Sequence, residues 1–171
     1  MINTKYYGVY GRYGLGNGWL LGLSVDLSEW DLEYPYKQLG YSIADEEAVD
    51  SKVDGTYVTA WIEREFMHES KAMRPYLLAG LGVGMLDASD ITVTLSDGRS
   101  ATIAADTGTE VIPGIGGGIR FLLGKRWFIE PSLRIDYHIT DITVTDRNTG
   151  KSSSYDDYFT YGGNVGLGVR F

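Results

Sequence analysis

The sequence contains no cysteine, only four prolines and two histidines. Without cysteine there can be neither a disulfide framework nor a thiolate metal site. No apolar run reaches the roughly 18 residues that a transmembrane helix requires, although strands that cross a bilayer alternate and need no such run. Acidic residues outnumber basic ones by 23 to 15, and the net charge of −8 argues against a nucleic-acid partner.

Glycine and tyrosine are abundant instead, with 23 and 13 copies among 171 residues. The length suggests a single domain, 1–171. We identify no Gly-rich phosphate loop followed by a helix and no loop with calcium-ligand spacing, so we expect no cofactor and no metal. The acidic segment 45–54 could bind Ca²⁺ or bridge to phosphates, but a solvated loop is the preferred interpretation.

The last thirteen residues, 159–171, alternate strictly between two kinds of side chain. A strand directs successive side chains to opposite faces, so this segment has one apolar face with aromatic residues at both ends. Aromatic rings favour the membrane–water interface, which makes the pattern typical of a strand that crosses a bilayer. The apolar face comprises Phe159, Tyr161, Gly163, Val165, Leu167, Val169 and Phe171.

Similar alternation recurs along the chain and is bounded by turn signals such as Gly16-Asn17-Gly18. The fold class we predict is all-β, an antiparallel up-and-down transmembrane β-barrel. Eight strands are the favoured count because single-chain bacterial barrels have even numbers, although only seven are strongly marked. The weak one is 37–45, and the facing of 55–67 stays open. The expected strands are 5–15, 19–28, 37–45, 55–67, 76–85, 114–123, 129–140 and 159–171.

Without 37–45, short turns at 16–18, 68–73 and 124–126 alternate regularly with long loops at 31–53, 87–109 and 144–157. That arrangement corresponds to strands two to eight of a barrel of this kind. The loop 87–109 contains a hairpin that we expect to project well beyond the membrane.

Alternation alone does not distinguish a membrane barrel from a soluble, lipocalin-like barrel with an apolar interior. Three features favour the membrane: glycine on the polar faces, the sparse and mixed charge of those faces, and aromatic residues near strand ends. The expected interface aromatics are Trp19, Trp30, Trp127, Phe159 and Phe171.

Charged residues on the polar faces then point into a narrow interior. Charges removed from bulk water must pair, so we predict a salt-bridged interior and not an open pore. A gated ion path through the same residues is the alternative. The predicted network comprises Arg12, Asp26, Arg120, Glu130, Arg134, Asp136 and Arg170.

The chain resembles the small bacterial outer-membrane barrels of the OmpX/Ail and OmpA transmembrane-domain type. The resemblance rests on the hairpin 6–27, on Ala79-Gly-Leu-Gly-Val-Gly84, on Gly116-Gly-Gly-Ile-Arg-Phe121 and on the ending Val165-Gly-Leu-Gly-Val-Arg-Phe171. It implies a monomer in the bacterial outer membrane, surrounded by lipid and lipopolysaccharide, whose last strand is read by the barrel-assembly machinery. The start of the chain lacks the features of a signal peptide, so we expect a mature form.

The same resemblance implies a structural or adhesion role, in which polar outer loops contact a host or surface ligand. A narrow transporter for small solutes is the alternative. A lipid A hydrolase is a weaker one, since PagL-type enzymes carry His-x-Ser where this chain has His138-x-Thr140. Asp156 would have to orient the histidine, and a polar interior His138 is the preferred interpretation, so we expect no enzyme.

Overall fold

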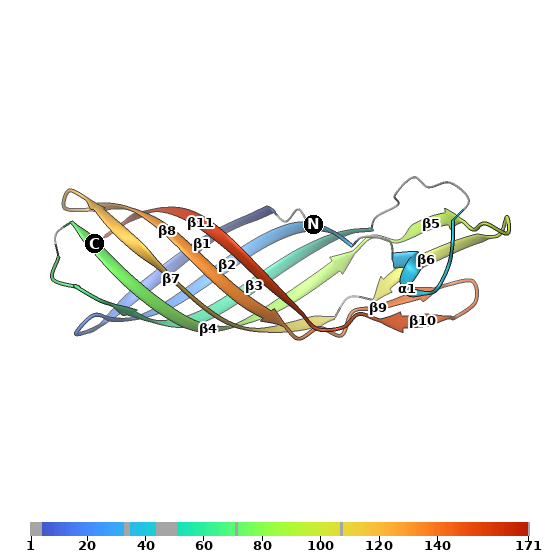
Figure 1. Cartoon of the computed structure of the whole chain (residues 1–171), viewed down its shortest axis with the longest axis horizontal. Coiled ribbons are helices and arrows are strands. Elements are labelled where there is room, and N and C mark those ends of the chain that lie inside the picture. The colour runs from blue at the N-terminus through green and yellow to red at the C-terminus, as the bar shows by residue number, and fades with distance from the viewer. Residues whose placement is uncertain (1–4, 33–34, 44–50, 71, 107, 171) are drawn as a thin grey trace.

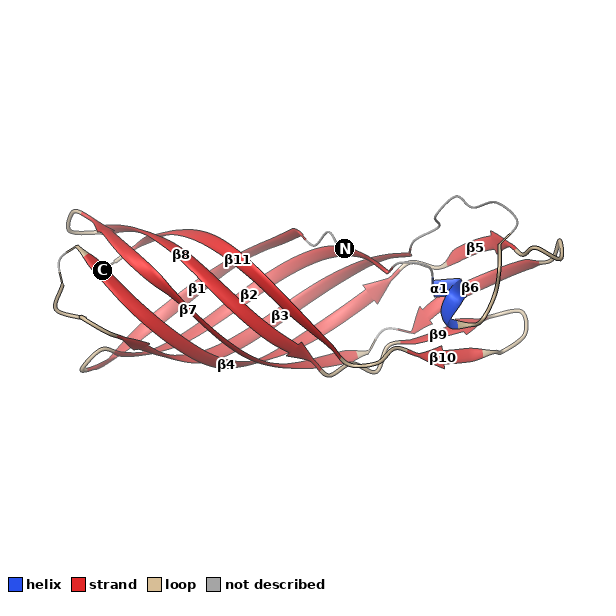
Figure 2. Cartoon of the chain, viewed as in Figure 1, coloured by secondary structure: helices blue, strands red, loops and turns tan. Residues whose placement is uncertain are grey.

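The computed structural model describes residues 5–32, 35–43, 51–70, 72–106 and 108–170, and these are almost entirely antiparallel β-structure (Figures 1 and 2). A seven-stranded sheet has the order β1-β2-β3-β4-β7-β8-β11. Its strands are β1 (Lys5–Gly16), β2 (Trp19–Leu32), β3 (Ser51–Glu65), β4 (Met73–Ala88), β7 (Thr109–Leu123), β8 (Trp127–His138) and β11 (Tyr158–Val169).

Local sequence accounts for the first hairpin. Gly16, Asn17 and Gly18 all have positive φ, at 94°, 51° and 77°, which the twist of a tight hairpin demands and which glycine and asparagine tolerate. The register that follows pairs Tyr13 with Leu21 and continues as far as Lys5 with Glu29. The turn therefore sets the pairing of two long strands.

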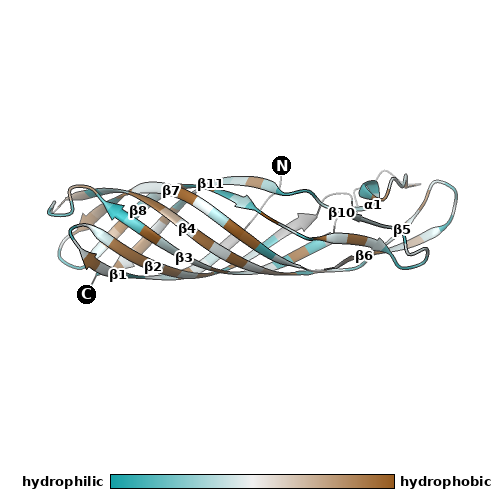
Figure 3. Ribbon diagram, turned by 90° about the horizontal axis from the view of Figure 1, so that it is seen from below, coloured by the Kyte–Doolittle hydropathy of each residue, from teal (hydrophilic) through white to brown (hydrophobic). Residues whose placement is uncertain are grey.

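The sheet is rolled, with its apolar face outward. Leu23, Leu133 and Leu167, from three different strands, are 54%, 72% and 66% exposed. Alternation of hydrophobic and hydrophilic residues is visible along several strands of the rolled sheet (Figure 3). Large exposed apolar side chains on strands throughout the sheet are unusual on a water-facing surface but suit a lipid-facing one.

The facing of β3, which alternation left open, is decided by its surroundings. Tyr57, Thr59, Trp61, Glu63 and Glu65 are buried in the interior. The alternate set, which includes Val58 and Ile62, is exposed. Both sets mix apolar and charged residues, so only the arginines brought from other strands show which set lies inside.

The long loops fold into a second layer at one end of the molecule (Figure 1). A four-stranded sheet has the order β10-β9-β6-β5. Its strands are β5 (Ile91–Thr94), β6 (Ser100–Asp106), β9 (Thr143–Asp146) and β10 (Ser152–Ser154), beside the four-residue helix α1 (Pro35–Gln38). None of the described helices is long and apolar enough to cross a membrane.

This extension contains the main apolar core of the molecule. Leu39, Val53, Ile103 and Val144 are at most 1% exposed, and Tyr57 and Leu86 contribute from the adjoining ends of β3 and β4. The hairpin expected within 87–109 is present as β5 and β6. Because the hairpin packs on this core, the extension is an ordered structure and not a set of separate loops.

Two predictions about strands were wrong. Residues 37–45 do not form a membrane strand: their described part holds the end of α1 and a single bridge from Ile43 to Leu95. Their weak alternation comes from Leu39 packing into the extension core. The main sheet accordingly has seven strands and not eight, and no pairing closes β1 onto β11 among the described residues.

Candidate functional site

Three arginines and three glutamates form an ion-pair cluster inside the rolled sheet, near its short-turn end. Arg12 comes from β1, Arg74 from β4 and Arg120 from β7, while Glu63 and Glu65 come from β3 and Glu130 from β8. Their side chains are between 0% and 15% exposed. Strands that are distant in the chain therefore meet through charge.

Arg120 is the centre of this cluster. Its Nη2 donates to Glu63 Oε1 at 2.8 Å, its Nε donates to Glu130 Oε2 at 2.8 Å, and its Nη1 donates to Glu65. One guanidinium thus serves three carboxylates on two strands, a geometry that the planar fork of arginine allows and that lysine cannot reproduce.

Arg12 extends the cluster to the first strand. It makes a bidentate pair with Glu130 at 2.7 and 2.6 Å, and its Nε lies 3.1 Å from Glu63 Oε2. Arg74 closes the other side with a bond of 3.3 Å to Glu65. The cluster holds equal numbers of positive and negative groups, so charge is balanced where water is scarce.

Aromatic rings lie against the cluster. The guanidinium carbon of Arg12 lies 4.6 Å from the ring centroid of Tyr10 and 5.7 Å from that of Tyr76, and that of Arg120 lies 5.1 Å from Tyr76. Phe128 faces Arg120 from another side at 5.3 Å. These rings give the cations a second favourable partner and fill space that water would otherwise occupy.

The structure brings together three of the residues predicted for the interior network, Arg12, Arg120 and Glu130. Arg134 and Asp136 also lie inside but form a pair of their own at 2.7 Å. Asp26 accepts a hydrogen bond from Ser24 at 2.6 Å and is outside the cluster.

Glu63, Glu65 and Arg74 are in the cluster although sequence reasoning missed them. The first two lie on the strand whose facing was open, and Arg74 directly follows a segment read as a turn. A useful signal was present, because Glu63 and Glu65 share one face of a strand that otherwise carries Tyr57 and Trp61.

His138 has partners other than those expected. Its Nδ1 lies 2.9 Å from Glu110 Oε2 and its Nε2 lies 3.0 Å from Thr160 Oγ1. Thr140 instead bonds through its backbone N–H to Asp157. The ring of Tyr158 stacks on the imidazole at 4.5 Å, and its hydroxyl donates to Glu110 at 3.0 Å.

This acid, imidazole and hydroxyl stand in the order used by hydrolase triads. However, His138 is only 3% exposed and Glu110 is fully buried. The two groups satisfy each other's polar atoms in the interior. The arrangement explains a buried histidine without any reaction.

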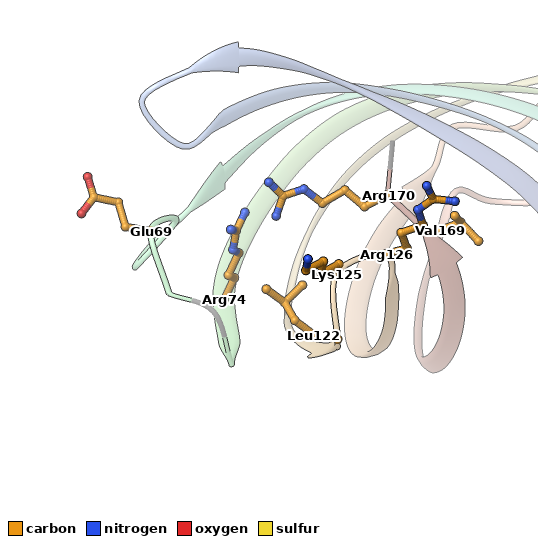
Figure 4. Close-up of a pocket in the computed structure, with 8 residues that line it drawn as sticks. Glu69, Arg74, Leu122, Lys125, Arg126, Val169 and Arg170 are labelled. Atoms are coloured by element: carbon orange, nitrogen blue, oxygen red, sulfur yellow. The ribbon is translucent and has the colours of Figure 1, made fainter.

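A basic mouth lies at the short-turn end of the rolled sheet (Figure 4). A cavity of about 770 Å³ is lined there by four basic residues, Arg74, Lys125, Arg126 and Arg170, and by one acidic residue, Glu69. Arg170, predicted for the interior network, therefore lies at this opening. The mouth presents positive charge in a protein that is acidic as a whole.

Aromatic side chains occupy strand ends on the outer face. Trp19 and Trp127 are 43% and 52% exposed at the short-turn end, and Phe159 is 71% exposed towards the extension. The side chain of Trp30 and residue Phe171 lie outside the described part of the structure. That these aromatic residues mark the membrane interface stays a prediction.

The outer face of the extension forms a hydroxyl platform, in which each of four adjacent strands contributes two serine or threonine residues two positions apart. On β6 the same face continues with Ala104 and Asp106. Thr92 faces Thr102 across the sheet with hydroxyls 3.5 Å apart, and Thr143 faces Ser154 at 3.1 Å. The opposite face packs on the apolar core. The platform comprises Thr92, Thr94, Ser100, Thr102, Thr143, Thr145, Ser152 and Ser154.

An antiparallel sheet with an apolar outer face and paired charges inside is typical of outer-membrane β-barrel proteins. The family model for the autotransporter beta-domain matches residues 3–171, and the chain belongs to that family. No curated protein shows significant similarity to the chain. The protein is thus an outer-membrane protein of the autotransporter β-domain family.

Proposed function

We propose that this protein is a non-conducting outer-membrane barrel whose role is surface interaction through the hydroxyl platform. The observation that carries the proposal is the ordered extension. Binding residues are disproportionately found on loops that a rigid scaffold holds in place, and here the loops are held by a buried core. Long loops of such barrels face the cell exterior, which orients the platform outward.

The platform favours an uncharged, hydrogen-bonding ligand. Its side chains are short hydroxyls that can both donate and accept, and within the described strands they are regularly spaced by the sheet. Saccharide chains of lipopolysaccharide present the same groups and surround an outer-membrane protein. We infer that such saccharide chains are the class of ligand that the platform binds. The adhesion role follows from this binding.

Binding can be tested with the protein in nanodiscs and purified saccharide chains, by surface plasmon resonance. Replacing Thr94 and Ser152 with lysine places bulk on the platform, because both side chains are exposed. We expect binding to weaken at least tenfold. The matched control replaces Arg99 and Asp97, which are exposed in the neighbouring turn and off the platform. Equal binding by the platform variant and the wild type would remove the proposal.

The charged cluster supports a sealed interior. Arg12 and Arg120 bridge β1, β3, β7 and β8 across the interior, where a solute path would have to pass. In planar bilayers we expect no stepwise conductance. Steady channels in the wild type would favour the narrow transporter instead.

We assign no catalytic role to His138. Tyr158 covers its ring and Glu110 occupies one nitrogen, so a lipid ester has no approach to Thr160 in this geometry. Mass spectrometry of lipid A from cells with and without the protein should show no difference. Loss of an acyl chain that is abolished by Thr160→Ala would identify a hydrolase.

A further inference from the structure

The rolled sheet has two edges within the membrane-spanning region. Among the described residues neither β1 nor β11 hydrogen-bonds to a strand on its outer side. The edges lie near each other, because a Cβ on Gly166 of β11 would be 3.2 Å from the hydroxyl of Tyr10 on β1. Backbone groups exposed to lipid have no water to bond, so open edges at this depth are strongly unfavourable.

Strand direction shows what fits between the edges. All six pairings of the main sheet are antiparallel. Seven strands that alternate in direction leave β1 and β11 pointing the same way. Direct closure would create a parallel pair, whereas one further strand between them would be antiparallel to both.

Each edge strand has an inward position with open space beside it. A Cβ added to Gly14 of β1 or to Gly162 of β11 would meet no atom within 4 Å. A Cβ added to inward glycines of internal strands would clash with interior side chains, for example at 2.2 Å with Trp61 for Gly22 and at 2.5 Å with Tyr57 for Gly84. Elsewhere on the edge strands a Cβ would clash, at 1.8 Å with Asp26 for Gly8 and at 2.2 Å with Phe128 for Gly168. The space for inward side chains therefore lies beside Gly14 and Gly162.

Charge at the β1 edge indicates one property of a strand that would pair with this edge. The carboxylate of Asp26 lies over Gly8 of the edge strand, where a Cβ would be only 1.8 Å from its Oδ1. Ser24 donates to its other oxygen, and among the described residues no lysine or arginine forms an ion pair with it. A positively charged side chain on a strand paired with β1 would balance the charge of the Asp26 carboxylate.

We propose that the gap between β1 and β11 is a binding site for one extended polypeptide strand of about ten residues, antiparallel to both edges. Its apolar side chains face lipid beside Val9 and Val165, its inward side chains are glycine or serine opposite Tyr10 and Gly166, and one inward lysine or arginine pairs with Asp26.

The test uses the full chain refolded in detergent with synthetic ten-residue peptides. In each peptide, leucine or valine at the lipid-facing positions alternates with glycine or serine at the inward positions. The peptides of one set each carry a single lysine, placed at a different inward position in each peptide. Native mass spectrometry should show a one-to-one complex, and hydrogen exchange should slow at β1 and β11 but not at β3. Asp26→Asn should weaken binding of the best lysine peptide about tenfold and leave its alanine counterpart unchanged. A peptide of the same composition without alternation is the control.

Cysteine pairs provide an independent readout, because the chain has no native cysteine. Residues 9 and 11 on β1 and 165 and 167 on β11 are changed to cysteine in pairs. Neighbouring strands are about 5 Å apart, so disulfides form only if the edges pair directly. We expect no disulfide, but capture by a linker that spans about 10 Å. High-yield disulfides, a dimer that protects both edges, or no peptide binding would each overturn the proposal.

Discussion

Replacing Arg120 with methionine removes the centre of the interior cluster while keeping a long, unbranched side chain of similar reach. Glu63, Glu65 and Glu130 then keep only Arg12 and Arg74, so the cluster changes from neutral to one net negative charge. Removing one partner of a buried ion pair costs about 3–5 kcal/mol. Because three carboxylates are affected, we expect the free energy of unfolding to fall by an amount in the upper part of that range. This is a large share of a typical free energy of unfolding of about 5–15 kcal/mol.

The free energy of unfolding can be measured by urea titration of the refolded protein in detergent, followed by tryptophan fluorescence and by the gel mobility of unheated samples. Arg99→Met is the matched control. Arg99 pairs with Asp97 where both side chains are at least half exposed, and such pairs are worth at most about 1 kcal/mol.

Two further variants keep the result interpretable. Arg120→Lys retains the positive charge but loses the planar, forked donor geometry of arginine. Its free energy of unfolding should therefore lie between those of Arg120→Met and the wild type. Adding Glu63→Gln to Arg120→Met restores neutrality and should recover part of the loss. If Arg120→Met unfolds as easily as Arg99→Met does, the cluster does not stabilise the fold and our account of the interior is wrong.

Three other variants test the skin, the packing and the extension. Leu133→Arg places a charge on the lipid face and should cost about 2–4 kcal/mol near the bilayer midplane, measured by the same titration in lipid vesicles. Gly22→Ala forces a methyl against Trp61 and should cost about 1–3 kcal/mol, whereas Gly14→Ala, inward but uncrowded, should be neutral; equal losses would refute the packing argument. Burial raises the pKa of Asp146, but hydrogen bonds from Thr149, Asn148 and Tyr41 outweigh it, so the pKa is lowered overall. The stabilisation from Asp146 is present above the ordinary aspartate pKa of about 3.9 and is lost as the pH falls below it. Protection factors for hydrogen exchange in the extension, taken relative to the intrinsic rate at each pH, should therefore fall at low pH in the wild type but not in Asp146→Asn.

Sequence alone determined the features that follow from local rules. Alternation on 19–28, 129–140 and 159–171 predicted the strands and their apolar faces because side-chain direction repeats every two residues whatever the surroundings. Turn chemistry at 16–18 and the short turn at 124–126 predicted which strands are adjacent. These signals are local, and no distant contact was needed to interpret them.

Tertiary structure decided what depends on distant partners. The inward face of β3 is set by Arg12 and Arg120, which arrive from strands far away in sequence. Residues 37–45 alternate weakly because Leu39 enters the extension core and not because they cross a membrane. The loops carry no membrane period, so their folding into a platform could not be read from alternation. Where a charge or a loop residue ends up depends on what the rolled sheet brings beside it.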